Sequence, residues 1–137
     1  MSNRPSPYHL HPSKPITLAH VNINSITAPD RLDELETFAD THDIDIMCLT
    51  ETKLGNAVSS PLYYMDGFSQ PLTKHRDRHG GGVAIYAKNN LAVTRLIDLE
   101  LDAIEWIWAK VRTSGHKFIV CCVYFRYETV RIDPPDY

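Results

Sequence analysis

The sequence predicts a domain of the α/β class, and three observations carry that prediction. A strand, a helix and a second strand follow one another between residues 16 and 49. From residue 83 to residue 125, short apolar segments are separated by turn residues, which is typical of β-strands. The composition is ordinary for a globular protein, with 43% hydrophobic and 23% charged residues in a chain of 137, a length that suits one domain.

The first segment, residues 16–24, alternates apolar and polar residues and is predicted to be a strand. Pro29 and Asp30 open a helix that ends near residue 42. Its N-cap is predicted to be Asp30 or, with Pro29 at the first helical position, Ala28. Its apolar face is built by residues at helical spacing: Leu32, Leu35, Phe38 and Ala39. A strand buried on both faces follows at residues 44–49, and the helical crossover is long enough for the two strands to pair in parallel.

Glu51 is the leading candidate for a functional residue. It follows the buried strand directly, where an unpaired carboxylate would cost several kcal/mol, so a cation, a lysine or hydrogen-bond donors are expected beside it. Parallel pairing would bring Asn22 and Asn24, at the end of the first strand, to the same edge of the sheet. The alternatives are a Glu51 that is solvated or paired with Lys53, and an Asx-turn at Asn24.

A basic loop is predicted at residues 74–82, after a short strand at residues 67–71. Lys74, Arg76 and Arg78 precede three consecutive glycines, and a loop of this kind can approach a phosphate chain. The alternative is a solvated hairpin loop in which the glycines serve only the turn.

Four strands are predicted in the second half of the chain, at residues 83–88, 91–97, 104–111 and 118–125. The connections are short, with a tight hairpin at Asn89–Asn90 and a turn at Ser114–Gly115, so consecutive strands are expected to be antiparallel neighbours. The last strand is the most apolar and is predicted to be central.

Charge and hydropathy restrict the class of protein. A net charge of −3 gives no overall attraction to nucleic acid, so any polyanion must be bound by a local patch or a metal. Neither a spanning apolar segment nor a signal peptide is present, so no membrane partner and an intracellular location, nuclear or cytoplasmic, are expected. Residues 1–14 hold three prolines and predict a flexible tail.

Four motifs together resemble the endonuclease/exonuclease/phosphatase family, and more narrowly the apurinic-endonuclease-type domain of non-LTR retrotransposons. They are H-V-N-I-N-S at 20–25, I-M-C-L-T-E-T-K-L at 46–54, R-H-G-G-G-V-A-I-Y at 78–86 and V-C-C-V-Y at 120–124. The resemblance implies the N-terminal part of a four-layer α/β sandwich, with mixed sheets flanked by helices, that cuts phosphodiester bonds in DNA with Mg²⁺. It implies Glu51 and Asn24 as metal-site residues, Asn22 and Tyr124 as catalytic residues that contact the phosphate, and a basic DNA-binding loop.

The sequence departs from the family after Tyr124. The Asp-x-Asn and Ser-Asp-His motifs of the family's C-terminal half are not found in the 137 residues. We therefore expect residues 15–127 to be a partial domain, followed by a divergent tail at 128–137, with one weak, incomplete Mg²⁺ site. Little or no activity is expected from this chain alone, and self-association is expected through an exposed sheet. Two alternatives are a nuclease completed by another chain and a non-catalytic interaction module.

Overall fold

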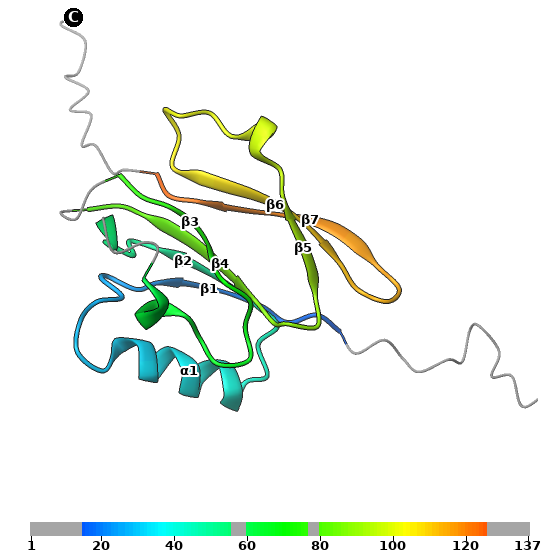
Figure 1. Ribbon diagram of the computed structural model, residues 1–137, viewed down its shortest axis with the longest axis horizontal. Helices are drawn as coiled ribbons and strands as arrows, with labels where there is room; N and C mark the ends of the chain where they lie inside the picture. Colours follow the sequence, from blue (N-terminus) through cyan, green and yellow to red (C-terminus); the bar gives the residue numbers. More distant parts are fainter. Residues whose placement is uncertain (1–14, 56–59, 77–79, 126–137) are drawn as a thin grey trace, which may run out of the picture.

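A computed structural model describes residues 15–55, 60–76 and 80–125 of the chain. These residues form three layers, in which one helix covers a four-stranded sheet and a three-stranded sheet covers the other face of that sheet (Figure 1). The predicted α/β class is confirmed, and the four-stranded sheet is mixed, whereas the three-stranded sheet is antiparallel throughout. The expected tails at 1–14 and 128–137 lie outside the described residues.

The four-stranded sheet contains the predicted strand–helix–strand unit. Its order is β1–β2–β4–β3, with bounds β1 (Leu18–Asn22), β2 (Ile46–Thr50), β3 (Leu72–Lys74) and β4 (Val83–Ala87). β1 and β2 pair in parallel, with Asn22 opposite Thr50, whereas β4 runs antiparallel to both β2 and β3. The parallel register places the ends of β1 and β2 side by side, as the sequence predicted.

Helix α1 (Arg31–Thr41) covers one face of this sheet and buries Leu35 and Ala39 against it. Asp30 is at the N-cap as predicted, but its φ of 64° is left-handed and its side chain makes no capping bond. Phe38, which was predicted to lie on the apolar face, is 39% exposed and stacks beside His42, 4.7 Å between ring centroids.

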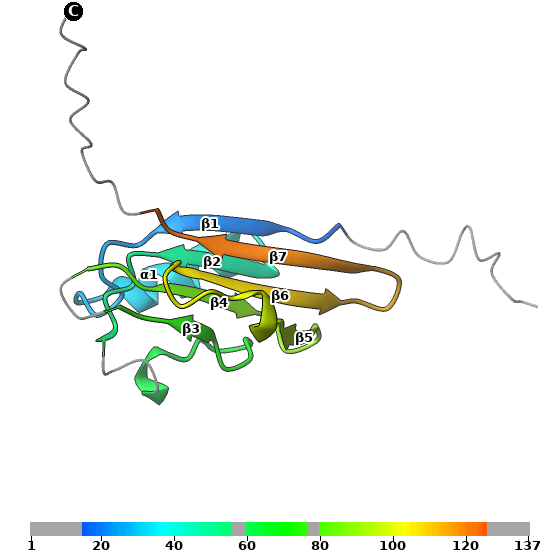
Figure 2. The same ribbon diagram turned by 90° about the horizontal axis from the view of Figure 1, so that it is seen from above.

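The three-stranded sheet has the order β5–β6–β7, all antiparallel, with bounds β5 (Ala92–Arg95), β6 (Trp106–Arg112) and β7 (Lys117–Val123). Two short 3-10 helices, η2 (Pro61–Tyr63) and η3 (Ile97–Leu99), lie in the connections. Between the two layers β7 packs on β2 and β4, and β6 packs on β3 and β4. Seen from above, β7 overlies the β1–β2 side of the four-stranded sheet, whereas β5 lies toward its β3 side (Figure 2).

The core has two parts, one on each face of the four-stranded sheet. Every residue of β2 and β4 is buried, so both strands are covered on both faces. Met47, Leu49 and Tyr86 face the helix, whereas Ile46 and Ile85 face the second sheet. The prediction that residues 44–49 form a strand buried on both faces is therefore confirmed.

The prediction of a hairpin at Asn89–Asn90 is wrong, because the strands before and after it, β4 and β5, belong to different sheets. β4 already has β2 and β3 as its two neighbours, so no edge is left for β5. Leu91 is buried between the sheets, and the chain there crosses from one layer to the other.

Two further strand predictions need correction. The strand predicted at residues 67–71 lies instead at Leu72–Lys74, because Gly67 takes a turn conformation with φ 80° and Pro71 has no N–H to donate. The strand at 118–125 was predicted to be central, but among the described strands β7 is at an edge and β6 has both neighbours. The high apolar content of β7 reflects the burial of alternate residues against the other sheet, and it does not indicate a central position within its own sheet.

Candidate active site

The candidate site lies where β1 and β2 end, and the backbone pairing continues beyond both strands. Ile23 N–H donates to the Thr50 carbonyl at 3.0 Å, and Ser25 N–H donates to the Glu51 carbonyl at 2.8 Å. Ile26 is almost fully buried, and its N–H donates to the Thr52 carbonyl at 3.0 Å. The two segments that follow the strands are thus held side by side, which fixes the side chains they carry.

A third segment, the last two of the three glycines, pairs with the other side of this extension. Thr52 N–H donates to the Gly82 carbonyl at 3.2 Å, and Lys53 N–H donates to the Gly81 carbonyl at 3.0 Å. Gly82 has a φ of 92°, and a Cβ there would overlap the Thr52 hydroxyl. The glycines are therefore required by close backbone approach at this edge, in addition to any role in a turn.

Left-handed backbone conformations gather at this edge of the sheet. Of the six non-glycine residues with positive φ in the described ranges, four lie here: Asn24 (46°), Ser25 (79°), Glu51 (55°) and Lys53 (52°). Such conformations cost about 1–3 kcal/mol each and persist only where the surrounding contacts impose them, which happens most often at functional sites.

Glu51 is the centre of the site. Tyr124 donates its hydroxyl proton to Oε1 of Glu51 at 2.6 Å, although the two residues are 73 positions apart in the sequence. The pKa of Glu51 lies below its usual value, chiefly because of the Tyr124 hydrogen bond; a bond from the Asn22 side chain and the charge of Lys53 also lower it, while burial opposes them. The carboxylate is therefore charged and held in place at neutral pH.

The two asparagines make different contacts. The Asn22 side chain lies near Glu51 and helps to lower its pKa, and its Oδ1 accepts the Asn24 N–H at 3.3 Å, an Asx-turn. Oδ1 of Asn24 accepts a hydrogen bond from Lys53 Nζ at 2.7 Å. The structure thus brings Asn22, Glu51 and Tyr124 together, and it connects Asn24 to them through Lys53.

The basic residues of the predicted loop are already engaged within the protein where they are described. Lys74 Nζ donates to two carbonyls, those of Leu101 at 3.0 Å and Ile104 at 2.9 Å. Arg76 lies 3.9 Å from the Glu105 carboxylate and is exposed, and Arg78 lies outside the described residues. A hollow of about 440 Å³ opens beside Tyr124, lined in part by Arg76 and the exposed Phe125.

The donor set suits a hard divalent cation. It offers one charged carboxylate, at Glu51, together with the neutral oxygens of Asn22 and Tyr124. Mg²⁺ in proteins commonly takes one or two carboxylates, keeps several waters and is completed by substrate phosphate oxygens. No group of three His, Cys, Asp or Glu side chains within the described residues could hold a metal, so any site here depends on Glu51 and its neutral neighbours.

Comparisons with known proteins identify the family of this chain. The family model described as "Endonuclease/Exonuclease/phosphatase family" matches residues 19–131, and the chain belongs to that family. None of the curated proteins that were searched matches the sequence significantly. Within the part of the chain that the structure describes, no helix is long and apolar enough to cross a membrane.

Two solved structures share the fold. The endonuclease domain of TRAS1, a telomere-specific non-LTR retrotransposon, superposes with a TM-score of 0.58 at 17% identity, over 82% of this chain and 47% of that one. The AP endonuclease LMAP from Leishmania major superposes with a TM-score of 0.61 at 18% identity, over 90% of this chain and 44% of that one. The chain therefore spans less than half the length of these structures.

Sequence reasoning missed Glu105 and the bridging position of Lys53. Glu105 precedes β6 in a region that reads simply as an alternating strand. The only sequence signal was a single carboxylate at the start of an apolar strand, and its partners lie more than 20 positions away.

Proposed function

We propose that this chain is the N-terminal part of a Mg²⁺-dependent endonuclease domain that cleaves phosphodiester bonds in DNA, of the kind found in non-LTR retrotransposons. The observation that carries the proposal is the hydrogen bond from Tyr124 to Glu51, at the edge where two parallel strands end and where Asn22 pairs with Thr50. The family assignment supports the reaction class, and TRAS1 supports the retrotransposon origin. A nuclear or cytoplasmic location is part of the same proposal.

In this proposal each residue has a defined part. The Glu51 carboxylate binds the cation, and Asn24 with Lys53 closes the same side of the site. Tyr124 donates its one hydroxyl hydrogen to the Glu51 carboxylate and orients it. The Asn22 amide, which has two N–H donors, donates a hydrogen bond toward a phosphate oxygen. Bound Mg²⁺ would polarise the phosphoryl group and neutralise charge on the leaving oxygen.

Water activation is the step for which we identify no residue. No histidine contacts Glu51 or Tyr124 among the described residues, and His20 instead lies 3.4 Å from the Thr50 hydroxyl. A general base typically contributes a factor of about 10² to 10⁴. We therefore propose that these 137 residues alone cleave DNA very slowly or not at all, and that a base from outside the described residues is needed for full activity.

The decisive experiment measures Mg²⁺ binding and nicking separately. Wild type should be stabilised by about 1.4 kcal/mol when free Mg²⁺ is ten times its Kd, and Glu51→Gln should abolish that gain. Glu34→Gln, the same change on the exposed face of α1, is the matched control. Equal Mg²⁺ stabilisation of wild type and Glu51→Gln would refute the metal assignment. Rapid Mg²⁺-dependent nicking of plasmid DNA by this chain alone would refute the proposed inactivity.

A second candidate role, self-association, is favoured by the outer face of the three-stranded sheet. Its exposed or half-buried apolar residues are Trp106, Trp108, Ile119, Cys121 and Val123. Both indole N–H groups are buried and find no acceptor in the described ranges, at a cost of about 1–3 kcal/mol each. β7 has no neighbour on its outer side among the described strands, so its unpaired edge can bind a second copy of the chain.

The charges at the two ends of this face favour a two-fold arrangement of copies. Lys110, Arg112 and Lys117 lie toward the turn between β6 and β7, whereas Asp98 and Asp102 lie in the connection at the other end. Antiparallel pairing of β7 with β7 of a second copy would bring the basic end of each face near the acidic end of the other.

A further inference from the structure

We infer that Glu105 is a positioning residue of the Glu51 site, which fastens the Gly81–Gly82 segment and the backbone of Tyr124 around that carboxylate. The inference rests on the proposed function, because it names a residue that prepares the proposed metal site. Glu105 itself makes no contact with Glu51 in the structure. It acts through groups that do.

The Glu105 carboxylate is nearly enclosed and already partnered. Its side chain is 13% exposed, its Oε1 accepts the Gly82 N–H, and its Oε2 lies 3.9 Å from Arg76 Nη1. A Cβ at Gly81, where φ is 70°, would overlap this carboxylate. Glycine at position 81 thus makes room for Glu105, and Glu105 in turn satisfies a backbone donor of the glycine segment.

Two chains of contacts lead from Glu105 to Glu51. Through the first, the Gly81 and Gly82 carbonyls accept the N–H groups of Lys53 and Thr52, which follow Glu51 directly. Through the second, the carbonyl of Glu105 accepts the Tyr124 N–H at 2.9 Å, and the Tyr124 hydroxyl donates to Glu51. Glu105 therefore connects the glycine segment with Tyr124, the two flanks of the Glu51 carboxylate.

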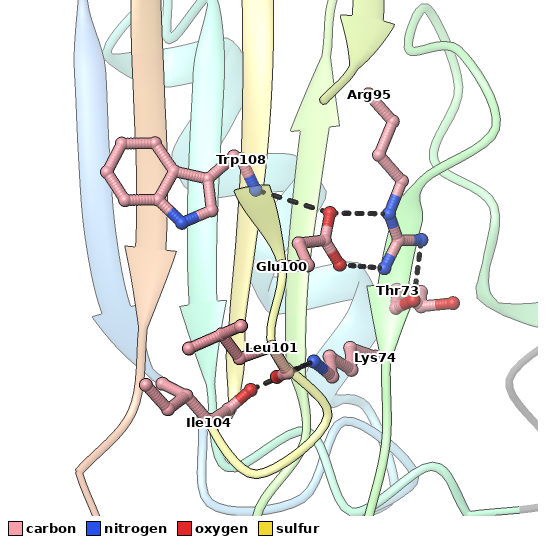
Figure 3. Close-up of polar contacts among 7 residues, drawn as sticks. All are labelled: Thr73, Lys74, Arg95, Glu100, Leu101, Ile104 and Trp108. Atoms are coloured by element: carbon pink, nitrogen blue, oxygen red, sulfur yellow. Dashed lines mark hydrogen bonds and ion pairs between the residues drawn. The ribbon is translucent and has the colours of Figure 1, made fainter. Parts of the chain in front are cut away.

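The connection that carries Glu105 is itself held firmly, as Figure 3 shows. Lys74 Nζ reaches the carbonyls of Leu101 and Ile104, the residue just before Glu105. Farther back, Arg95 makes two bonds to the Glu100 carboxylate, at 2.9 and 2.7 Å, and a third to the Thr73 carbonyl at 3.1 Å. Because this connection is bonded to β3 and β5, the Glu105 carboxylate is held in a fixed place and can in turn fix the Gly82 N–H that it accepts.

The test compares three variants by two measurements. Glu105→Gln keeps an oxygen that accepts the Gly82 N–H, Glu105→Ala removes it, and Asp102→Asn is a matched control on the same connection. Amide exchange of Gly82 reports the local bond. Nuclear Overhauser contacts between the Tyr124 ring and the Glu51 side chain report the site without any metal.

We expect Glu105→Ala to speed Gly82 exchange at least tenfold and to abolish the Tyr124–Glu51 contacts. Glu105→Gln should stay within about threefold of wild type in Gly82 exchange and keep those contacts, and Asp102→Asn should match wild type. Unchanged Tyr124–Glu51 contacts in a folded Glu105→Ala would overturn the inference. Loss of the contacts in Glu105→Gln, with Gly82 still protected, would overturn it too.

Tb³⁺ binding separates this inference from the proposed function. Tb³⁺ emission sensitised by Tyr124 should be lost in Glu51→Gln. The affinity of the protein for Tb³⁺ should fall at least tenfold in Glu105→Ala. Absence of Tb³⁺ binding to wild type would count against the metal proposal alone, because the exchange and contact measurements still decide the role of Glu105.

A double-mutant cycle keeps the inference falsifiable if Glu105→Ala is poorly folded. Gly81→Ala should cost more stability in the wild-type background than in the Glu105→Ala background, because the overlap with the Glu105 carboxylate is then gone and only the strain of the φ of 70° remains. Strictly additive effects of the two substitutions on folding midpoint would contradict the proposed link between positions 81 and 105. If the double variant is also unfolded, the comparison of Glu105→Gln with Asp102→Asn decides.

Discussion

Tyr124 and Glu51 meet through a hydrogen bond of 2.6 Å that joins the two sheets at the edge where β1 and β2 end. Tyr124 follows β7 in the second sheet, and Glu51 follows β2 in the first. The bond therefore forms only when the two sheets are stacked. It contributes to the stability of the packed sheets, and it also positions the carboxylate of the candidate site.

Replacing Tyr124 with phenylalanine should raise the pKa of Glu51 toward its ordinary value, because the Tyr124 bond is the main cause of its lowered pKa. A carboxyl with a lowered folded pKa stabilises the fold above its unfolded pKa, near 4.3, and that contribution disappears as pH falls through the folded pKa. Tyr124→Phe should therefore flatten the acid side of the stability profile. Carboxyl carbon NMR titration gives the pKa directly, and an unchanged value would contradict the bond.

Replacing Glu100 with glutamine should destabilise the protein by about 1.5–3 kcal/mol, the usual contribution of a hydrogen bond to a charged group. The Glu100 side chain is 3% exposed and makes two bonds to Arg95 (Figure 3). Urea unfolding at pH 7 measures the change, and Glu34→Gln on the wet face of α1 is the control. A loss no greater than that of the control would mean that the ion pair adds nothing.

The cost of Glu100→Gln should also depend on pH. Burial alone would raise the pKa of Glu100, but the hydrogen bonds and charge of Arg95 outweigh it and leave the pKa below its ordinary value. The stabilisation is then complete above the unfolded pKa, near 4.3, and declines as pH falls through the folded pKa. The stability difference between wild type and variant should shrink below about pH 4, and a difference that grows with acidity would reverse the assigned sign.

Replacing Tyr86 with phenylalanine should cost about 1 kcal/mol, because the buried hydroxyl donates to the Tyr63 carbonyl at 2.6 Å and connects β4 to η2. Burial also raises the pKa of Tyr86 well above its usual range. Tyr86 should therefore stay protonated at pH 11 for as long as the protein remains folded. Ultraviolet difference titration of wild type against Tyr86→Phe measures this, and one ionisation fewer in the variant at pH 11 would refute it.

Replacing Ile119 with lysine should weaken self-association at least tenfold. Ile119 is 57% exposed on the outer face of β7, and a charge on an open strand edge opposes pairing with a second copy. Sedimentation equilibrium gives the association constant, and Thr94→Lys on β5, away from the β7 edge, is the control.

Mild oxidation should cross-link copies through Cys121, since Cys48 and Cys122 are buried. A wild-type chain that stays monomeric at millimolar concentration would end this proposal.

The sequence by itself determined the strand–helix–strand unit and the approach of Asn22 to Glu51. Period-two and period-3.6 patterns act within one segment, and an eleven-residue helix between two strands leaves parallel pairing as the natural connection. The family motifs were also readable, since they are local strings. They indicated Tyr124 as a site residue, but the partner of its hydroxyl could not be read from them.

Tertiary structure alone decided the rest. The turn at Asn89–Asn90 could not reveal that β4 has no free edge, because its neighbours come from residues 46–50 and 72–74. Glu105 could not be recognised either, since its contacts with Gly82 and Arg76 exist only when the two sheets are stacked. Local patterns specify which face of a segment is buried, whereas the partners across a sheet or between layers are selected by packing of the whole domain.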